Sequence, residues 1–361
     1  MALPSKDIPE FHARLKDKVA EARARGQPLL IQGSNSKSFY GRHCEGEPVD
    51  MTACSGIINY DPTELVITAN AGTSIKGLEE VLAREGQMLP FEPPCFSKTA
   101  TLGGIVATGL SGPRRPYTGS VRDYILGTRC LTGRGEILKF GGEVMKNVAG
   151  YDVSRLMTGA MGTLGIILEA SLKVLPLPKF ELALCKAMTV TEAMYVMNEI
   201  AGKSLCISGA AYQNGLVRFR LSGKQVAVEK AWKSLGMQED PDGLDYWQGL
   251  RNHTLDFFNR KNGSNLWRLS VPANTASMEI QGDSLIDWGG AQRWYYSEQP
   301  AEDIWQIAES AGGHATLFRG SNNAKEVFQP LSTVMHKLHQ QLKQAFDPDR
   351  IMNRGRMYPD F

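Results

Sequence analysis

The sequence predicts an α+β protein built in two parts. Up to residue 177, short apolar strands alternate with amphipathic helices, and residues 166–174 have the composition of a buried strand. Pro176-Leu-Pro178 ends that strand, and the density of glycine falls beyond it. A second series of strands and helices follows. We therefore expect an N-terminal domain of residues 1–177 and a smaller α+β domain of residues 178–361.

The first part has clear helix and strand patterns. Thr73-Ser74 is a capping pair, followed by apolar residues at helical spacing, and Gly86 ends the pattern. We expect helices at residues 8–25 and 75–85, and strands at residues 28–32, 57–60, 64–70, 124–126, 129–132, 137–140 and 166–174. Residues 101–109 are rich in glycine and weakly apolar, so we expect them to form neither a well-packed helix nor a strand, and a flat ligand to fill the missing volume.

The second part repeats the alternation with different spacing. We expect strands at residues 180–189, 207–212, 216–221, 267–271, 285–288, 291–295 and 314–318. Helices are expected at residues 191–201, 224–235, 304–311 and 331–345, the last ending at Asp347-Pro348.

Composition and charge exclude several classes of protein. The chain is 42% hydrophobic and 22% charged, which is typical of a soluble globular protein. Its formal net charge of +2 does not indicate a dedicated nucleic-acid binder. No apolar run reaches the roughly 20 residues that span a bilayer, and the N-terminus lacks an apolar signal core. We expect a cytoplasmic protein that reaches the inner face of the membrane only through a partner.

The six cysteines are scattered, and no Cys-x-x-Cys pair occurs. This spacing indicates neither an iron–sulfur cluster, nor a zinc site, nor a secreted disulfide framework. We expect reduced thiols and no cluster of the chain's own.

Two glycine-rich segments suit a ligand that approaches the backbone closely. Residues 33–38 follow a short apolar strand and offer several N–H groups to an anion, although their spacing matches neither a P-loop nor the dinucleotide Gly-x-Gly-x-x-Gly. Residues 141–176 carry a polar patch, Lys146-Asn147, and three glycines within seven residues just before a buried strand. Ordinary turns are the alternative interpretation of each segment.

Taken in order, several blocks resemble a known family. They are Thr101-Leu-Gly-Gly, the residues YTGSVRDYILG from Tyr117, Gly150-Tyr-Asp, the residues GTLGII from Gly162, and FDPDRIMNRGR from Phe346. This order resembles the FAD-linked oxidase family, with its vanillyl-alcohol-oxidase (PCMH) type of FAD domain. The phrases IQGSNSKSF, GLSGPRRPYTGSVRD and FGGEVMKNVAGYD resemble, within that family, the smaller FAD-binding subunits of bacterial glycolate oxidase (glycolate dehydrogenase).

The resemblance implies an FAD site with three walls. Gly33 begins the loop for the diphosphate, Thr101 begins a second wall, and Gly162 begins a third. The implied FAD residues are Gly33, Ser34, Asn35, Ser36, Pro94, Thr101, Gly103, Gly104, Thr108, Gly119, Asp123, Gly162, Thr163, Gly165, Ile166 and Ile167. Residues 33–38 contain no histidine or cysteine, so we expect FAD to be bound non-covalently.

Oxidation of a 2-hydroxy acid at a flavin needs a base near the hydroxyl group and a cation for the carboxylate. The candidates are His314 as the base and Arg268 and Arg293 as cations, with Arg319 as a further arginine. Each has a structural alternative, such as stacking of an arginine on a neighbouring tryptophan. Relatives often carry His-x-Gly-Asp-Gly-Asn, whereas this chain has His314-Ala-Thr-Leu.

Two further groups of basic residues raise the questions of a metal site and of a contact with a partner. His336 and His339 are close to one helical turn apart, but no carboxylate at matching spacing completes a metal site, so we expect no metal. Arg114-Arg115 is interpreted as a loop that contacts a partner subunit.

The leading hypothesis is an FAD-binding subunit that oxidises glycolate to glyoxylate, with D-lactate as a further candidate substrate. It passes electrons to an iron–sulfur subunit in a complex with a larger FAD-binding subunit. Two alternatives stay open: a non-catalytic flavin-bearing scaffold or electron relay, and a stand-alone FAD-dependent 2-hydroxy-acid dehydrogenase.

Overall fold

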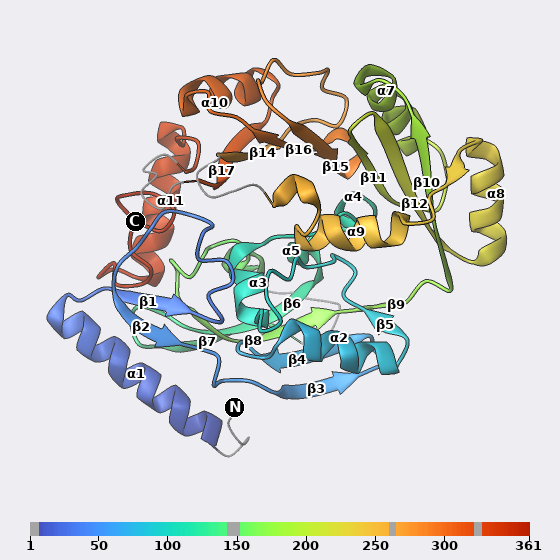
Figure 1. Cartoon of the computed structure of the whole chain (residues 1–361). Coiled ribbons are helices and arrows are strands. Elements are labelled where there is room, and N and C mark those ends of the chain that lie inside the picture. The colour runs from blue at the N-terminus through green and yellow to red at the C-terminus, as the bar shows by residue number, and fades with distance from the viewer. Residues whose placement is uncertain (1–6, 143–151, 260–264, 321–326) are drawn as a thin grey trace. The chain divides into compact units, whose positions relative to one another are not determined.

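The computed structural model describes residues 7–142, 152–259, 265–320 and 327–361, in two compact units (Figure 1). Unit 1 comprises Met1–Leu110, Ser120–Pro176 and Pro330–Phe361, and unit 2 comprises Ser111–Gly119 and Leu177–Gln329. The second unit therefore differs from the expected domain of residues 178–361, because the last part of the chain packs into unit 1. Lys146-Asn147 and Gly150-Tyr151 lie outside the described residues.

Unit 1 is built around an antiparallel five-stranded sheet in the order β3-β4-β8-β6-β7. These strands are β3 (Ile57–Asp61), β4 (Val66–Asn70), β6 (Ile125–Leu131), β7 (Ile137–Gly141) and β8 (Ile166–Lys173). Two small sheets accompany it: parallel β1 (Leu29–Gln32) and β2 (Glu47–Asp50), and antiparallel β5 (Gln87–Met88) and β9 (Leu175–Pro176). The helices of unit 1 are α1 (Ile8–Arg25), α2 (Ile75–Arg84), α3 (Leu102–Thr108), α5 (Val121–Tyr124), α6 (Val153–Met157) and α11 (Thr333–Phe346).

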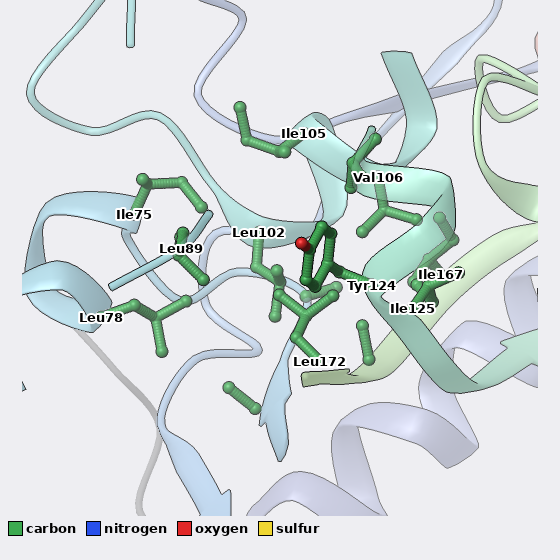
Figure 2. Close-up of a cluster of buried hydrophobic side chains, with 14 of the residues drawn as sticks. Ile75, Leu78, Leu89, Leu102, Ile105, Val106, Tyr124, Ile125, Ile167 and Leu172 are labelled. Atoms are coloured by element: carbon green, nitrogen blue, oxygen red, sulfur yellow. The ribbon is translucent and has the colours of Figure 1, made fainter. Parts of the chain in front are cut away.

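The segment expected to be neither helix nor strand forms helix α3, so that expectation was wrong. Thr101 caps the helix, its side chain accepting a hydrogen bond from the N–H of Gly104. Leu102, Ile105 and Val106 are buried in the core beside residues of α2 and β8 (Figure 2). Burying each such side chain stabilises the fold by roughly 1.5–3 kcal/mol, which outweighs a glycine penalty of about 1 kcal/mol per residue.

The C-terminal segment belongs to unit 1 through buried polar contacts. Lys343 on α11 forms an ion pair with Asp347 at 2.8 Å, and both side chains are almost fully buried. The ammonium also donates to the carbonyls of Thr163 and Met352. Leu29 of β1 forms a parallel bridge with Met352, so the returning chain extends the small β1–β2 sheet. The sequence predicted helix α11 close to its observed position, but the predicted domain boundary assigned it to the wrong unit.

Unit 2 is an antiparallel eight-stranded sheet in the order β13-β10-β12-β11-β15-β16-β14-β17. The strands are β10 (Phe180–Ala187), β11 (Ile207–Gln213), β12 (Leu216–Gly223), β13 (Gln238–Glu239), β14 (Leu266–Ser270), β15 (Ser284–Asp287), β16 (Gln292–Tyr296) and β17 (His314–Arg319). Its helices are α4 (Arg115–Thr118), α7 (Val190–Ala201), α8 (Gln225–Leu235), α9 (Gly243–Asn252) and α10 (Ala301–Ser310), with short 3₁₀ turns η2 (Asp256–Phe258) and η3 (Trp288–Gly290).

The sheet of unit 2 is covered by two apolar clusters. Helices α7 and α8 pack on β10, β11 and β12, while α10 packs on β14, β16 and β17. These helices and strands were predicted from the sequence, but α9, whose Trp247 is 1% exposed, was not. No helix in the described part of the chain combines the length and apolarity that crossing a bilayer requires.

Candidate functional site

A cavity of about 330 Å³ lies within unit 1. Its walls come from the loop after β1, the start of α3, the glycine-rich turn before β8 and the C-terminal segment. The lining residues at the positions expected to hold FAD are Gly33, Ser34, Asn35, Ser36, Thr101, Gly103, Gly104, Thr108, Gly162, Gly165 and Ile167. The structure thus brings together the three walls that the resemblance implied.

The first wall is the loop that follows β1. Asn35 adopts a left-handed conformation (φ 57°), and its side-chain amide donates to Gln32 Oε1 at 2.7 Å. A Cβ atom at Gly33 would overlap the hydroxyl of Thr101, so only glycine lets this loop approach the second wall. The loop therefore lies directly beside the N-cap of α3.

The second wall is α3, which presents bare backbone to the cavity. A Cβ atom added at Gly104 would have no neighbour within 4 Å except Thr101 Oγ1 at 3.1 Å. Because Gly104 also lines the cavity, the open space beside it belongs to the cavity. A flat ring can thus approach the helix backbone here, as the sequence-based hypothesis of a flat ligand requires.

The third wall depends on the C-terminal segment. Gly162 has φ 74°, and a Cβ atom there would lie 2.5 Å from Nδ2 of Asn353. Asn353 accepts from the N–H of Ile31 at 2.7 Å and donates to the carbonyl of Met161 at 2.8 Å. One buried side chain therefore joins β1, just before the first wall, to the turn of the third wall.

Arg356 performs a similar role for the first wall. Its guanidinium donates to the carbonyls of Lys37, Ser38, Tyr40 and Arg42. Asn353 and Arg356 line the cavity, and both were missed by sequence reasoning. The quoted motif from Phe346 contains them, but nothing in its spacing indicates that it returns to β1.

The cavity is suited to an anionic ligand. Its described lining residues include Lys37, His43 and Arg356 and no aspartate or glutamate. Burial lowers the pKa of Lys37 to about 8, with Cys95 acting in the opposite direction. A cavity with glycine walls, backbone donors and buried positive charge fits the flavin and diphosphate of FAD.

Some residues expected at the FAD site lie elsewhere. Thr163 donates its hydroxyl to the carbonyl of Ala160, and Ile166 is buried in the cluster that α1 covers. Asp123 forms a capping box with Ser120 at the start of α5. Pro94 is buried in unit 1 but is not among the lining residues, and Gly119 belongs to unit 2. The resemblance named segments that line the cavity, but it could not tell which side of each segment faces it.

The arginine candidates of unit 2 separate into two groups. Arg293 is fully buried and donates to the carbonyls of Thr275, Ala276 and Gly290. These contacts occupy its guanidinium within the protein, so Arg293 is not a substrate ligand. Arg319 donates to the carbonyl of Phe258.

Arg268 has a different environment. Its Nε donates to Gln292 at 2.7 Å, while its terminal nitrogens make no hydrogen bond to any described residue. Its guanidinium carbon lies 5.3 Å from the Trp288 ring centroid, and that of Arg115 lies 4.3 Å from a ring of the same side chain. Trp288 itself has φ 55°, a strained conformation for a bulky residue.

His314 lies near these two arginines at the start of β17. The residue is exposed at the surface, yet desolvation by its neighbours and the positive charges of Arg268 and Arg115 lower its pKa. The imidazole is therefore neutral at pH 7 and able to accept a proton. Arg268 and Arg115 thus form a cationic pair at Trp288, and both charges act on the neutral imidazole of His314.

The other basic groups are engaged within their own units. Arg114 forms an ion pair with the partly exposed carboxylate of Glu181 at 2.7 Å. The contact of Arg114-Arg115 with a partner subunit stays a prediction. His336 lies 2.8 Å from Asp360, and His339 packs near Tyr358. The described residues contain no cluster of three histidine, cysteine or acidic side chains that could hold a metal ion. The six cysteines, all within the described residues, form no disulfide.

The fold and the cavity define a nucleotide-binding flavoprotein, and comparisons with known proteins agree. A family described as FAD binding domain matches residues 7–141. The chain is 47% identical to glycolate oxidase subunit GlcE of Escherichia coli (strain K12), over 97% of this chain and 98% of that protein. It is 25% identical to a D-lactate dehydrogenase of Archaeoglobus fulgidus, over 83% of this chain and 79% of that protein.

A solved structure of alkyldihydroxyacetonephosphate synthase shares the fold, with a TM-score of 0.65 at 17% identity over 95% of this chain and 74% of that one. The chain belongs to the FAD-linked oxidase family that includes the GlcE subunit. It is an FAD-dependent oxidoreductase that acts on CH–OH groups, and the prediction of an α+β fold with a PCMH-type FAD-binding domain is confirmed.

Proposed function

We propose that this chain is the FAD-binding subunit of a glycolate oxidase and that it oxidises glycolate to glyoxylate with its own flavin. The observation that carries the proposal is 47% identity to GlcE along nearly the whole of both chains. The cavity of unit 1 supports it by supplying a site for non-covalent FAD, since its first wall has no histidine or cysteine between residues 33 and 38.

The reaction removes a hydride from the substrate carbon and a proton from its hydroxyl group. The glycine-rich walls of the unit 1 cavity would hold FAD, which would supply the hydride acceptor. We assign the proton to His314, because its lowered pKa keeps the imidazole neutral and able to accept it. We assign the carboxylate to the terminal nitrogens of Arg268, with Arg115 as a second positive charge.

The test is anaerobic addition of glycolate to the purified chain with FAD bound. We expect the oxidised flavin absorbance to bleach without any other subunit. D-lactate, added in parallel, tests whether a longer 2-hydroxy acid is accepted. Flavin that stays oxidised until partner subunits are added would overturn catalysis by this chain and favour the relay function.

A second prediction concerns Arg268. Replacing it with methionine keeps much of the stem and removes the charge, so the glycolate concentration for half-reduction is expected to rise about 10- to 100-fold. FAD content is expected to stay unchanged, because Arg268 belongs to unit 2 and the cavity to unit 1. Lys203→Met, at an exposed ion pair with Glu199, is the control and should leave both quantities unaltered. An unchanged glycolate dependence in Arg268→Met would remove this residue from the proposal.

The proposal extends to the partners. We propose that electrons leave through an iron–sulfur subunit in a complex that also holds a larger FAD-binding subunit. The scattered cysteines support this, since the sequence has no Cys-x-x-Cys pair of its own.

A relay or scaffold function is the second candidate. It is favoured by the residues that follow His314, because Ala315, Thr316 and Leu317 provide neither the acidic side chain nor the asparagine of the motif in relatives. The anaerobic experiment distinguishes the two functions directly.

A further inference from the structure

We propose that the ammonium group of Lys37 binds the diphosphate of FAD, so that a side-chain charge in the first wall supplements the backbone N–H groups. The proposal rests on FAD binding by unit 1 and does not depend on the identity of the substrate. It assigns a ligand-binding role to a residue that the glycine-rich pattern of this loop did not indicate.

The first argument is the burial of a cation without a carboxylate. The Lys37 side chain lines the cavity and is only 8% exposed. Its described interaction is with the ring of Phe96, whose centroid is 5.5 Å from Nζ, and no described carboxylate lies within ion-pair distance. Burying an ammonium group is costly unless an anion or several acceptors compensate it.

Lys343 shows what a compensated lysine looks like in the same unit. It is 2% exposed, and its ammonium contacts the carboxylate of Asp347 and two backbone carbonyls. Lys37 has none of these contacts, yet it is nearly as buried. The difference is explained if the partner of Lys37 is a ligand of the cavity.

The second argument is the arrangement of the other cations. Arg356 uses its guanidinium to hold the carbonyls of residues 37–42, so it fixes the backbone of Lys37. His43 is exposed and lies 4.0 Å from Glu45. Among the described lining residues, Lys37 is therefore the cation that combines burial with donors not used by the protein.

The third argument is the position of Lys37 in the loop. It directly follows Ser34, Asn35 and Ser36, which line the same cavity. These residues offer backbone N–H groups and hydroxyls to an anion. An ammonium group beside them adds a charge-assisted hydrogen bond, which is roughly twice as strong as a neutral one.

The test is equilibrium binding of FAD to the flavin-free full chain, followed by flavin fluorescence. Lys37→Met is expected to weaken FAD binding about 10- to 100-fold, whereas Lys37→Arg keeps the charge and most of the affinity. Lys98→Met is the matched control, because Lys98 is exposed and lies close to Phe96 in the chain. Equal affinities for the wild type and Lys37→Met would overturn the proposal.

A competition experiment identifies the part of FAD that Lys37 contacts. ADP carries a diphosphate but no flavin. Lys37→Met should therefore lower the affinity for ADP by a factor similar to that for FAD. Loss of FAD affinity with unchanged ADP affinity would place Lys37 at the flavin ring instead and contradict the proposal. A wild-type chain that is folded but binds no FAD would refute the cofactor assignment itself, which is a separate failure.

The pH dependence gives a second signature. Burial lowers the pKa of Lys37 to about 8, so above that pH the ligand-free protein must take up a proton when the diphosphate binds. FAD affinity is therefore expected to be constant below pH 7 and to fall between pH 8 and 9. Cys95 acts electrostatically on Lys37, and the other titratable or charged groups that line the cavity are His43, Cys44 and Arg356.

Two variants isolate the contribution of Lys37 to this profile. In Lys37→Arg the side chain stays protonated, so the fall between pH 8 and 9 is expected to disappear. In Cys95→Ser the fall is expected to remain. A profile that is lost in Cys95→Ser and kept in Lys37→Arg would assign the titration to Cys95 and contradict the role of Lys37.

Discussion

Replacing Gly104 with phenylalanine is expected to reduce the affinity for FAD by about 100-fold or more. The reason is geometric, because Gly104 lines the cavity and a Cβ atom there would have only Thr101 Oγ1 as a neighbour within 4 Å. An aromatic ring would occupy the space that the flavin needs. The measurement is the flavin-to-protein ratio of the purified protein, followed by titration with FAD.

Gly104→Ala is the matched control for this substitution. Its single methyl group lies 3.1 Å from Thr101 Oγ1, so a small shift accommodates it and most of the FAD should remain. All six tryptophans belong to unit 2, so their fluorescence reports whether that unit is intact in Gly104→Phe. Native tryptophan fluorescence with full flavin content in Gly104→Phe would show that α3 is not a wall of the FAD site.

Breaking the buried ion pair of the C-terminal segment is expected to have the largest effect on stability. Lys343→Met or Asp347→Asn leaves one charged partner uncompensated, which costs about 3–5 kcal/mol of unfolding free energy. Asp347 also accepts from the N–H groups of Ile351 and Met352, so the Asp347→Asn effect includes the turn before Asn353. We expect flavin release at lower urea concentration, with a smaller shift of the tryptophan transition of unit 2.

The control for this prediction is the neighbouring exposed ion pair. Asp349 lies 2.7 Å from Arg23, and both side chains are about two-fifths exposed. Asp349→Asn should therefore cost no more than about 1 kcal/mol. If Asp349→Asn and Asp347→Asn destabilise unit 1 equally, the buried pair has no special role in holding the C-terminal segment.

Much of unit 1 could be predicted from local sequence. Helix α1 begins and ends at the predicted residues because its apolar spacing and Gly26 are local signals. The three glycine-rich segments that line the cavity were named in order by the family resemblance, and their role in holding FAD stays a prediction. Helix α3 was missed because its glycines disfavour a helix, and only the core that receives Leu102, Ile105 and Val106 compensates for them.

The remaining site residues depend on contacts between distant parts of the chain. Asn353 accepts a hydrogen bond from Ile31, more than three hundred residues earlier in the chain, and no periodicity or spacing predicts such a pair. Arg293 and Arg268 lie on paired strands β16 and β14, yet one donates to backbone carbonyls and the other keeps terminal donors unused. Sequence shows the residue type, whereas the packing around each guanidinium decides its role.

The return of the chain to β1 affects the order in which the protein is completed during synthesis. Asn353 and Arg356 position two walls of the cavity, but the ribosome makes them only after all of unit 2. A nascent chain that has finished all three walls still lacks the residues that fix the geometry of the first and the third. FAD is therefore expected to enter after translation has passed Arg356, so that flavin content distinguishes complete chains from prematurely terminated ones.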